Sequence, residues 1–214
     1  MSRRREPPAP PPKPPERLHL GAGNARLPGW INIDMQAIPG VDVIADVTQG
    51  LDYSDVEAIY AEHFLEHLPL DAAIQFLLEA HRVLAPGAWI RLSTPNLDWV
   101  WSTHYRLDPD PLLKQRAALA INRAFHGWEH RFLWNREILA EALQACGFGE
   151  PRWCRWGESE LALFQGIERH ETYYDEEILP HVLIAEAQKS APQPERLARL
   201  RDLLIEGFLD HQHG

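Results

Sequence analysis

The residues best suited to chemistry are two glycines and a carboxylate near the start of the sequence. Gly21 and Gly23 flank Ala22 after the short run 18–20, and Asp34 closes a second apolar run. Glycines placed after a strand let the backbone turn sharply and approach a ligand, because no Cβ stands in the way. A carboxylate at the end of the next strand can accept two hydrogen bonds from a ribose diol. The pattern predicts a nucleoside-binding sheet edge, with an ordinary glycine hairpin as the alternative.

The same segment bears on which nucleoside is bound. The dinucleotide fingerprint needs a third small residue, G-x-G-x-x-G/A, and an acidic residue about 20 positions further on. Here Arg26 occupies the third position, Asp34 comes sooner, and Pro28-Gly29 leaves room for barely one helical turn to bind a pyrophosphate. S-adenosylmethionine (SAM) has the ribose and adenine but no phosphate. The segment therefore favours SAM, with a nicotinamide-dependent oxidoreductase as a weaker alternative.

A pair of histidines forms the second candidate site. His63 and His67 have the i, i+4 spacing that places two imidazoles on one helical face as zinc ligands. The metalloprotease pattern requires a glutamate directly after the first histidine, and Phe64 stands there instead. Pocket-lining residues, structural histidines and metal ligands all remain open, the first is favoured, and we expect no metal.

Aromatic residues and histidines gather again between positions 95 and 134. We expect Tyr105, His126 and Trp128 to form part of an acceptor wall, with His130 beside them. The region begins at the carboxyl end of an expected strand, where open α/β sheets bind their ligands. An aromatic core plug under a long loop is an equal alternative.

These residues need a scaffold of alternating strands and helices. Hydrophobic periodicity predicts strands at 18–20, 31–34, 41–45, 57–61, 89–93, 150–156 and 181–187, and helices at 70–84, 112–124, 137–145 and 194–209, with an excursion at 161–174. Alternating βα units with short connections imply a mostly parallel sheet that is covered on both faces.

Several of these segments together resemble the class I SAM-dependent methyltransferases. The first motif is similar to a compact form of that family's motif I, and further similarity lies at Asp46 and at 61–68, 82–88, 93–96 and 145–148. The resemblance implies an α/β, Rossmann-like, doubly wound, mostly parallel sheet with an antiparallel last strand. It also implies that SAM is the cofactor. The implied contacts are Gly21, Ala22, Gly23, Asp34, Asp46, Val47, Glu62 and His63. Asp46 would lie beside the adenine, and a strand-end cap is the alternative.

The resemblance implies methyl transfer to a small-molecule or glycan acceptor, and we expect an oxygen acceptor. No Asn/Asp-Pro-Pro-Tyr tetrapeptide, typical of enzymes that methylate amide or base nitrogens, follows the fourth strand. A hydroxyl acceptor would gain roughly 10²–10⁴-fold from a general base. We expect His130, and secondarily His63, to be catalytic. A SAM-binding partner module without catalysis remains an alternative.

Composition limits the remaining choices. The 214 residues suit one domain, expected at 16–190 with an insertion near 96–134, between a disordered proline-rich tail at 1–15 and a C-terminal helix at 191–214. A net charge of −10 argues against nucleic acid and anionic membranes as partners. Two cysteines form no disulfide framework, and no run approaches 18 apolar residues, so we expect a cytoplasmic protein. The oligomeric state is left open.

Overall fold

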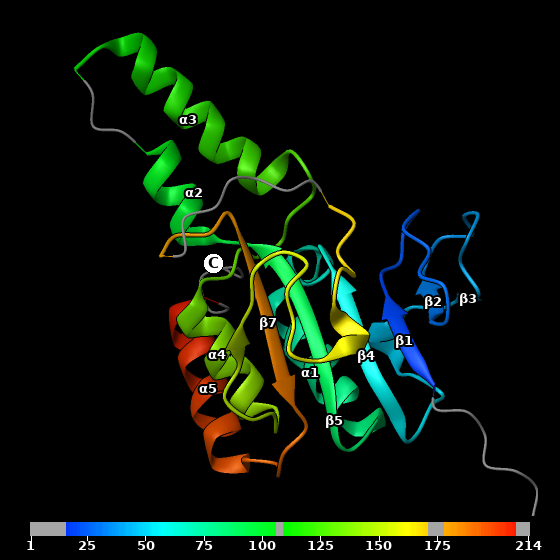
Figure 1. The fold of residues 1–214 in the computed structure, drawn as a ribbon. Coiled ribbons are helices and arrows are strands. Elements are labelled where there is room, and N and C mark those ends of the chain that lie inside the picture. Colours follow the sequence, from blue (N-terminus) through cyan, green and yellow to red (C-terminus); the bar gives the residue numbers. More distant parts are fainter. Residues whose placement is uncertain (1–15, 106–108, 171–177, 209–214) are drawn as a thin grey trace, which may run out of the picture.

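The protein is described here by a computed structural model that covers residues 16–105, 109–170 and 178–208 (Figure 1). Its centre is a seven-stranded sheet with the order β3-β2-β1-β4-β5-β7-β6. The strands are β1 (Arg17–Leu20), β2 (Ile31–Asp34), β3 (Val43–Ile44), β4 (Val56–Glu62), β5 (Leu84–Pro95), β6 (Arg152–Trp153) and β7 (Val182–Gln188). Strands β1 to β5 pair in parallel, and β7 is antiparallel to both β5 and β6. The predicted Rossmann-like sheet with an antiparallel last strand is confirmed.

Four helices of the described chain form where periodicity predicts them, whereas the helix over 97–104 was not predicted. The helices are α1 (Leu70–Val83), α2 (Leu97–His104), α3 (Pro111–His126), α4 (Arg136–Ala145) and α5 (Pro194–Gly207), with 3-10 turns η1 (Val47–Gln49), η2 (Leu65–His67) and η3 (Ala162–Phe164). Asp110 caps α3 by accepting a hydrogen bond from the Leu112 N–H, and Asn135 caps α4 in the same way from Ile138. These caps satisfy backbone donors that a helix start leaves free.

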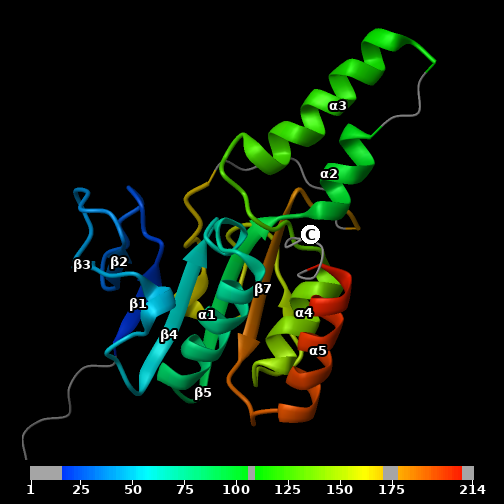
Figure 2. The ribbon, with the colours of Figure 1, turned by 180° about the vertical axis from the view of Figure 1, so that it is seen from behind.

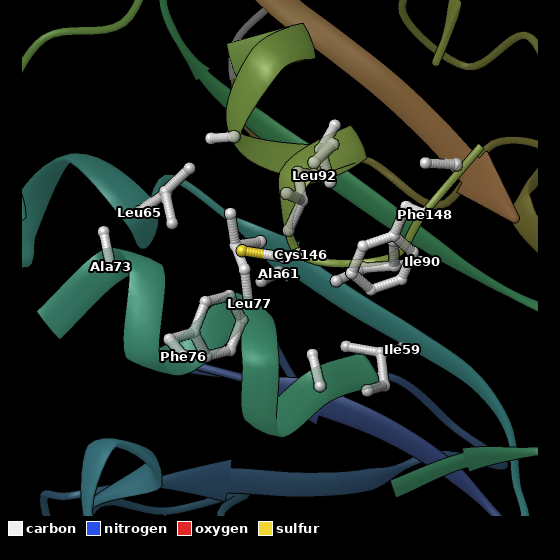
Figure 3. Close-up of a cluster of buried hydrophobic side chains, with 14 of the residues drawn as sticks. Ile59, Ala61, Leu65, Ala73, Phe76, Leu77, Ile90, Leu92, Cys146 and Phe148 are labelled. Carbon is white, nitrogen blue, oxygen red and sulfur yellow. The ribbon is translucent and has the colours of Figure 1, made fainter. Parts of the chain in front are cut away.

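One face of the sheet carries the main hydrophobic core. Helices α1, α4 and α5 pack on this face, and Figure 2 shows α1 lying over β4 and β5. Ile59 and Ile90 from the strands meet Phe76 and Leu77 from α1 and Phe148 after α4, as Figure 3 shows. All five side chains are fully buried, and each such burial contributes roughly 1.5–3 kcal/mol.

The opposite face is covered by connecting segments. In the described chain, Leu27, Phe164 and Ile167 from two connections pack there on Ala58 and Tyr60. The short connection between β1 and β2 has no helix, and Phe164 lies in the 3-10 turn η3. The prediction that both faces of the sheet are covered is therefore confirmed.

A buried charge cluster fastens one of these loops. Arg91 on β5 pairs with Glu168 in the β6–β7 connection, at 2.5 Å, and with Glu186 on β7. All three side chains have no exposed surface. Because an unpaired charge is costly to bury, Arg91 holds the loop against the sheet.

Other differences are local. Strand β5 begins at Leu84, earlier than the strand predicted at 89–93, while β3 and β6 are shorter than predicted. The expected insertion contains α2 and α3, which project beyond the sheet edge where β5 ends (Figure 1). The predicted tail at 1–15, part of the excursion and the last six positions lie outside the described residues. No described helix is both long enough and apolar enough to cross a membrane.

Candidate active site

The register of the sheet brings the predicted cofactor residues to one edge. Leu20 in β1 is level with Ile33 in β2 and with Ala61 in β4. The residues that follow, Gly21, Asp34 and Glu62, therefore lie side by side at the carboxyl ends of parallel strands. This is also where the strand order reverses, at β1 and β4, and ligands bind at such points.

The two glycines of the turn have different roles. Gly21 has φ +64° and Gly23 has φ +50°, both in the left-handed region that glycine tolerates. A Cβ on Gly21 would lie 2.4 Å from Cδ2 of Phe64, whereas a Cβ on Gly23 would meet nothing within 4 Å. Gly21 is thus required for packing, and Gly23 leaves open space for a ligand.

Hydrogen bonds fix Asp34 relative to this turn. Its Oδ2 accepts from the Gly23 N–H at 2.8 Å, and its Oδ1 accepts from the Gln36 N–H at 2.9 Å. The Ala22 N–H donates to the carbonyl of Ile33 at 3.0 Å, so the turn and β2 are joined twice. A carboxylate offers about four lone-pair sites, which leaves Asp34 able to accept two more hydrogen bonds.

Asp46 and Val47 lie after β3. Asp46 accepts hydrogen bonds from the backbone N–H of Thr48 at 2.9 Å and from its hydroxyl at 2.6 Å, and these bonds lower the pKa of Asp46. The cap that was the alternative interpretation is therefore present, and the adenine contact stays a prediction. The side chain of Val47 is buried in the core cluster, so only its backbone can face a cofactor.

Glu62 is held by a loop from much later in the chain. Its carboxylate accepts from the backbone N–H groups of Arg169 and His170, each at 2.9 Å, and contacts the His170 ring nitrogen. Burial opposes the charged form, but these hydrogen bonds outweigh it and lower the pKa of Glu62 to about 2. The predicted cofactor contact of Glu62 stays a prediction beside this observed structural role.

His63 is held in an unusual conformation. Its φ of +47° lies in the left-handed region, which costs a non-glycine residue about 1–2 kcal/mol. Its Nδ1 lies 2.9 Å from Oε1 of the fully buried Glu66, whose Oε2 accepts from the Thr94 hydroxyl at 3.0 Å. Burial opposes protonation of His63, but the hydrogen bond and charge of Glu66 outweigh it and raise its pKa.

His63 and His67 both line the same cavity, and the alternative that they share one helical face as a ligand pair is wrong. Residues 65–67 form a 3-10 turn, His63 precedes it, and its ring packs against His170 with centroids 4.8 Å apart. His67 instead meets the ring of His130, with centroids 5.1 Å apart. The ligand atoms of Glu66, His67 and His130 all lie within 4.8 Å of one another.

His130 has a defined tautomer. Its Nδ1 lies 2.7 Å from the carbonyl oxygen of Ala124, which can only accept, so Nδ1 carries the proton and Nε2 carries the lone pair. Burial lowers the pKa of His130 and favours this neutral form. An imidazole in this state can take a proton or bind a metal ion.

A cavity of about 810 Å³ is bordered by His63, Glu66, His67 and His130, and its volume is within the range of small-molecule sites. Its lining is rich in histidine, with His63, His67, His104, His130, His170 and His181. Trp128 also lines it and stacks on His130 with centroids 6.0 Å apart. Tyr105 stacks on Trp101, and neither Tyr105 nor His126 is among the cavity-lining residues. The acceptor roles of Tyr105 and His126 stay predictions.

Sequence reasoning missed several of these positions. The sequence predicts no role for Glu66, which lies in the segment 61–68. The signal that could have found it is a carboxylate directly before His67. His170, His104 and His181 come from distant segments, and no local pattern connects them to β4.

The strand order, the antiparallel β7 and the glycine turn bonded to Asp34 define the fold of class I SAM-dependent methyltransferases. Solved structures with this fold are similar to the chain over most of its length. The CurJ carbon methyltransferase matches with 18% identity and a TM-score of 0.51, over 86% of this chain and 50% of that one. A SAM-dependent methyltransferase from Archaeoglobus fulgidus matches with 16% identity and a TM-score of 0.51, over 83% and 87%.

A third structure, a possible histamine N-methyltransferase from Thermotoga maritima, has 15% identity and a TM-score of 0.50, over 82% of each chain. The chain thus spans about half the length of the CurJ structure. No protein-family model matches the sequence, and no curated protein matches it. At these sequence identities the similarity shows the fold alone. The names of the matched proteins include a carbon methyltransferase and a possible N-methyltransferase, so they do not identify the acceptor of this chain.

Proposed function

We propose that the chain is an enzyme that transfers a methyl group from SAM to a hydroxyl oxygen of a small-molecule or sugar acceptor. The observation that carries this proposal is the glycine turn hydrogen-bonded to Asp34 where the strand order reverses, together with a histidine-lined cavity that begins at His63, directly after β4. A cofactor bound at the turn would have its reactive end next to an acceptor in the cavity.

SAM fits this edge better than a dinucleotide does. Asp34 offers lone pairs to a ribose diol, and the open space beside Gly23 leaves room for the bound cofactor. The connection from Gly21 to Trp30 contains no helix, so a pyrophosphate would find no helix N-terminus there. Asp46, Val47, Glu62 and His63 complete the proposed cofactor contacts.

The chemistry needs orientation and the loss of one proton. The acceptor oxygen forms a bond to the methyl carbon as the carbon–sulfur bond breaks, and S-adenosylhomocysteine leaves. Holding both molecules in line can supply most of the rate, since the sulfonium is already activated. The hydroxyl proton must also be removed, and Nε2 of His130 is the general base that the sequence favours, while His63 is paired with Glu66.

The cofactor is tested by calorimetry with SAM and with NAD. Asp34→Ala removes charge-assisted hydrogen bonds of roughly 1.5–3 kcal/mol each, so SAM affinity should fall on the order of tenfold or more. Asp52→Ala, on the exposed part of a nearby connection, is the control and should leave the affinity unchanged. Tighter binding of NAD, or an unchanged Kd in a folded Asp34 variant, would contradict this site.

The reaction is tested by the release of S-adenosylhomocysteine in a panel of glycans and small hydroxyl compounds. Turnover with an oxygen acceptor supports the proposal. SAM binding without turnover for any acceptor favours the alternative of a catalytically silent partner module. The acidic chain, with its net charge of −10, argues against nucleic acid in the panel. Both cysteines are free, in keeping with a cytoplasmic enzyme.

A further inference from the structure

Three side chains that line the cavity together form a metal-ligand set. Glu66 is buried, His130 is half-buried and His67 is exposed, and their ligand atoms lie within 4.8 Å of one another. Two imidazoles and one carboxylate are a ligand combination of catalytic zinc sites, which keep a further position open. When bonds to the metal are about 2.0–2.2 Å long, two ligand atoms of a tetrahedral site lie about 3.4 Å from each other. Movements of about 1 Å by the ligand atoms would therefore bring these three side chains to that spacing.

The backbone already joins the two segments that carry these ligands. The carbonyl oxygen of Glu66 accepts from the N–H of Arg131 at 2.7 Å and from the N–H of Phe132 at 3.2 Å. The turn η2, with Glu66 and His67, is therefore fixed beside the residues that follow His130. A ligand set brought together by two hydrogen bonds of the main chain needs little ordering when an ion binds.

Each of two ligands also has an orienting partner. His130 donates its Nδ1–H to the Ala124 carbonyl, which leaves Nε2 as the ring nitrogen whose lone pair can bind an ion. Glu66 accepts from the Thr94 hydroxyl and contacts Nδ1 of His63, so its carboxylate cannot rotate freely. Metal-binding histidines and carboxylates have such outer partners almost always, and removing a partner weakens binding by roughly 10- to 100-fold.

A purely structural role accounts for these contacts less well. His67 is exposed and contributes a ring-edge contact to His130, so it adds little buried surface. Glu66 has no exposed surface and already contacts His63 and the Thr94 hydroxyl, and each carboxylate oxygen keeps a second lone pair for a further partner. An ion between the three side chains would use such a lone pair, and it would explain why the exposed His67 ring lies beside Glu66 and His130.

The geometry points to a divalent transition-metal site formed by Glu66, His67 and His130, with an open coordination position toward the cavity. Imidazole nitrogen and carboxylate oxygen suit Zn²⁺ and its neighbours, whereas Mg²⁺ and Ca²⁺ prefer oxygen ligands alone. This differs from the expectation, drawn from the sequence, of no metal. It also makes His130 a ligand instead of the base.

The role of the ion rests on the proposed function. The acceptor hydroxyl would take the open position, where a bound cation lowers the pKa of a coordinated oxygen acid. The proton passes to water in the cavity, and the oxygen then attacks the methyl carbon as the carbon–sulfur bond breaks. The metal keeps its charge throughout, so no oxidant or reductant is needed.

The test uses the full chain without a histidine tag, stripped with a chelator and titrated with Zn²⁺ by calorimetry. We expect one ion per chain, and we expect Co²⁺ to give the visible absorption of a nitrogen- and oxygen-ligated ion. His67→Ala should weaken Zn²⁺ binding at least 10-fold, and since His67 is exposed this variant should fold. Thr94→Val, which removes an orienting partner, should weaken binding roughly 10- to 100-fold.

His104→Ala is the matched control, because His104 lines the same cavity but is not in the cluster. Equal Zn²⁺ affinity in the His67 and His104 variants, or no binding in the stripped wild type, would overturn the metal site. SAM affinity is measured on the same samples. Intact SAM binding with no metal binding rejects only this inference, whereas metal binding with no SAM binding rejects only the proposed function.

Discussion

Replacing Gly21 with alanine tests the packing at the centre of the proposed cofactor site. The alanine would have to keep a φ of +64°, and its Cβ would lie 2.4 Å from Cδ2 and 2.9 Å from Cγ of Phe64. The Phe64 ring packs edge to face on Phe76 of α1, with centroids 5.2 Å apart, so it has little room to move. The left-handed backbone costs about 1–2 kcal/mol, and overpacking costs about 1–3 kcal/mol more.

Gly23→Ala carries the backbone cost without the overpacking cost, so the difference between the two variants isolates the overpacking. Gly23 has a similar φ of +50°, but its Cβ would meet nothing within 4 Å, so only the backbone cost of about 1–2 kcal/mol applies. Urea unfolding should show that Gly21→Ala is less stable than Gly23→Ala by about 1–3 kcal/mol, which corresponds to about 2–12 °C in Tm. For Gly23→Ala, the loss in free energy of SAM binding should exceed the loss in free energy of unfolding. Equal stability of the two variants would refute the close contact with Phe64.

Two further substitutions test the β6–β7 connection, which covers the opposite face of the sheet. The carboxyl of Glu62 has its pKa lowered from 4.5 to about 2, so its contribution to stability, about 3 kcal/mol, is present above pH about 5 and is lost as the pH falls toward 2. The stability difference between wild type and Glu62→Gln should therefore shrink over that range in urea titrations, while the exposed Glu158→Gln control shows no such trend. Arg91→Leu should cost about 3–5 kcal/mol, because two buried carboxylates lose their cation. In the same urea assay, Arg26→Leu, from an exposed pair at 3.6 Å, should cost no more than about 1 kcal/mol, and a similar loss in both variants would contradict the buried cluster.

The cofactor edge could be predicted from the sequence because its parts are close in the chain and share one physical rule. Carboxyl ends of neighbouring parallel strands meet at one edge, so the glycine turn and Asp34 had to lie together once both strands were recognised. Periodicity likewise located α1, α4 and α5, since each buries apolar residues at helical spacing, and it located α3 although Ala124 is the buried residue of that helix. These features depend on local pattern alone.

The acceptor side could not be predicted in the same way. His130 joins Glu66 and His67 because the chain returns from α3 along η2, and backbone hydrogen bonds to the Glu66 carbonyl fix this path. Such bonds depend on no particular side chain, so the sequence carries no mark of them. The i, i+4 spacing of His63 and His67 misled for the related reason that the segment tightens into a 3-10 turn.

The loop that holds Glu62 also bears on how the protein folds and opens. Its hydrogen bonds to Glu62 join positions 107 and 108 residues apart, and Phe164 in the same connection shields Tyr60 on β4. Contacts this distant in sequence form late, since the intervening chain must be ordered first. We expect the described part of this connection, over 162–170, to dock late and to open before the central strands in native-state amide exchange. Because Glu62 ends β4 at the proposed cofactor edge, each opening would also loosen that edge. A cofactor bound there would then slow exchange in the loop, so occupancy could be read from residues that never contact the ligand.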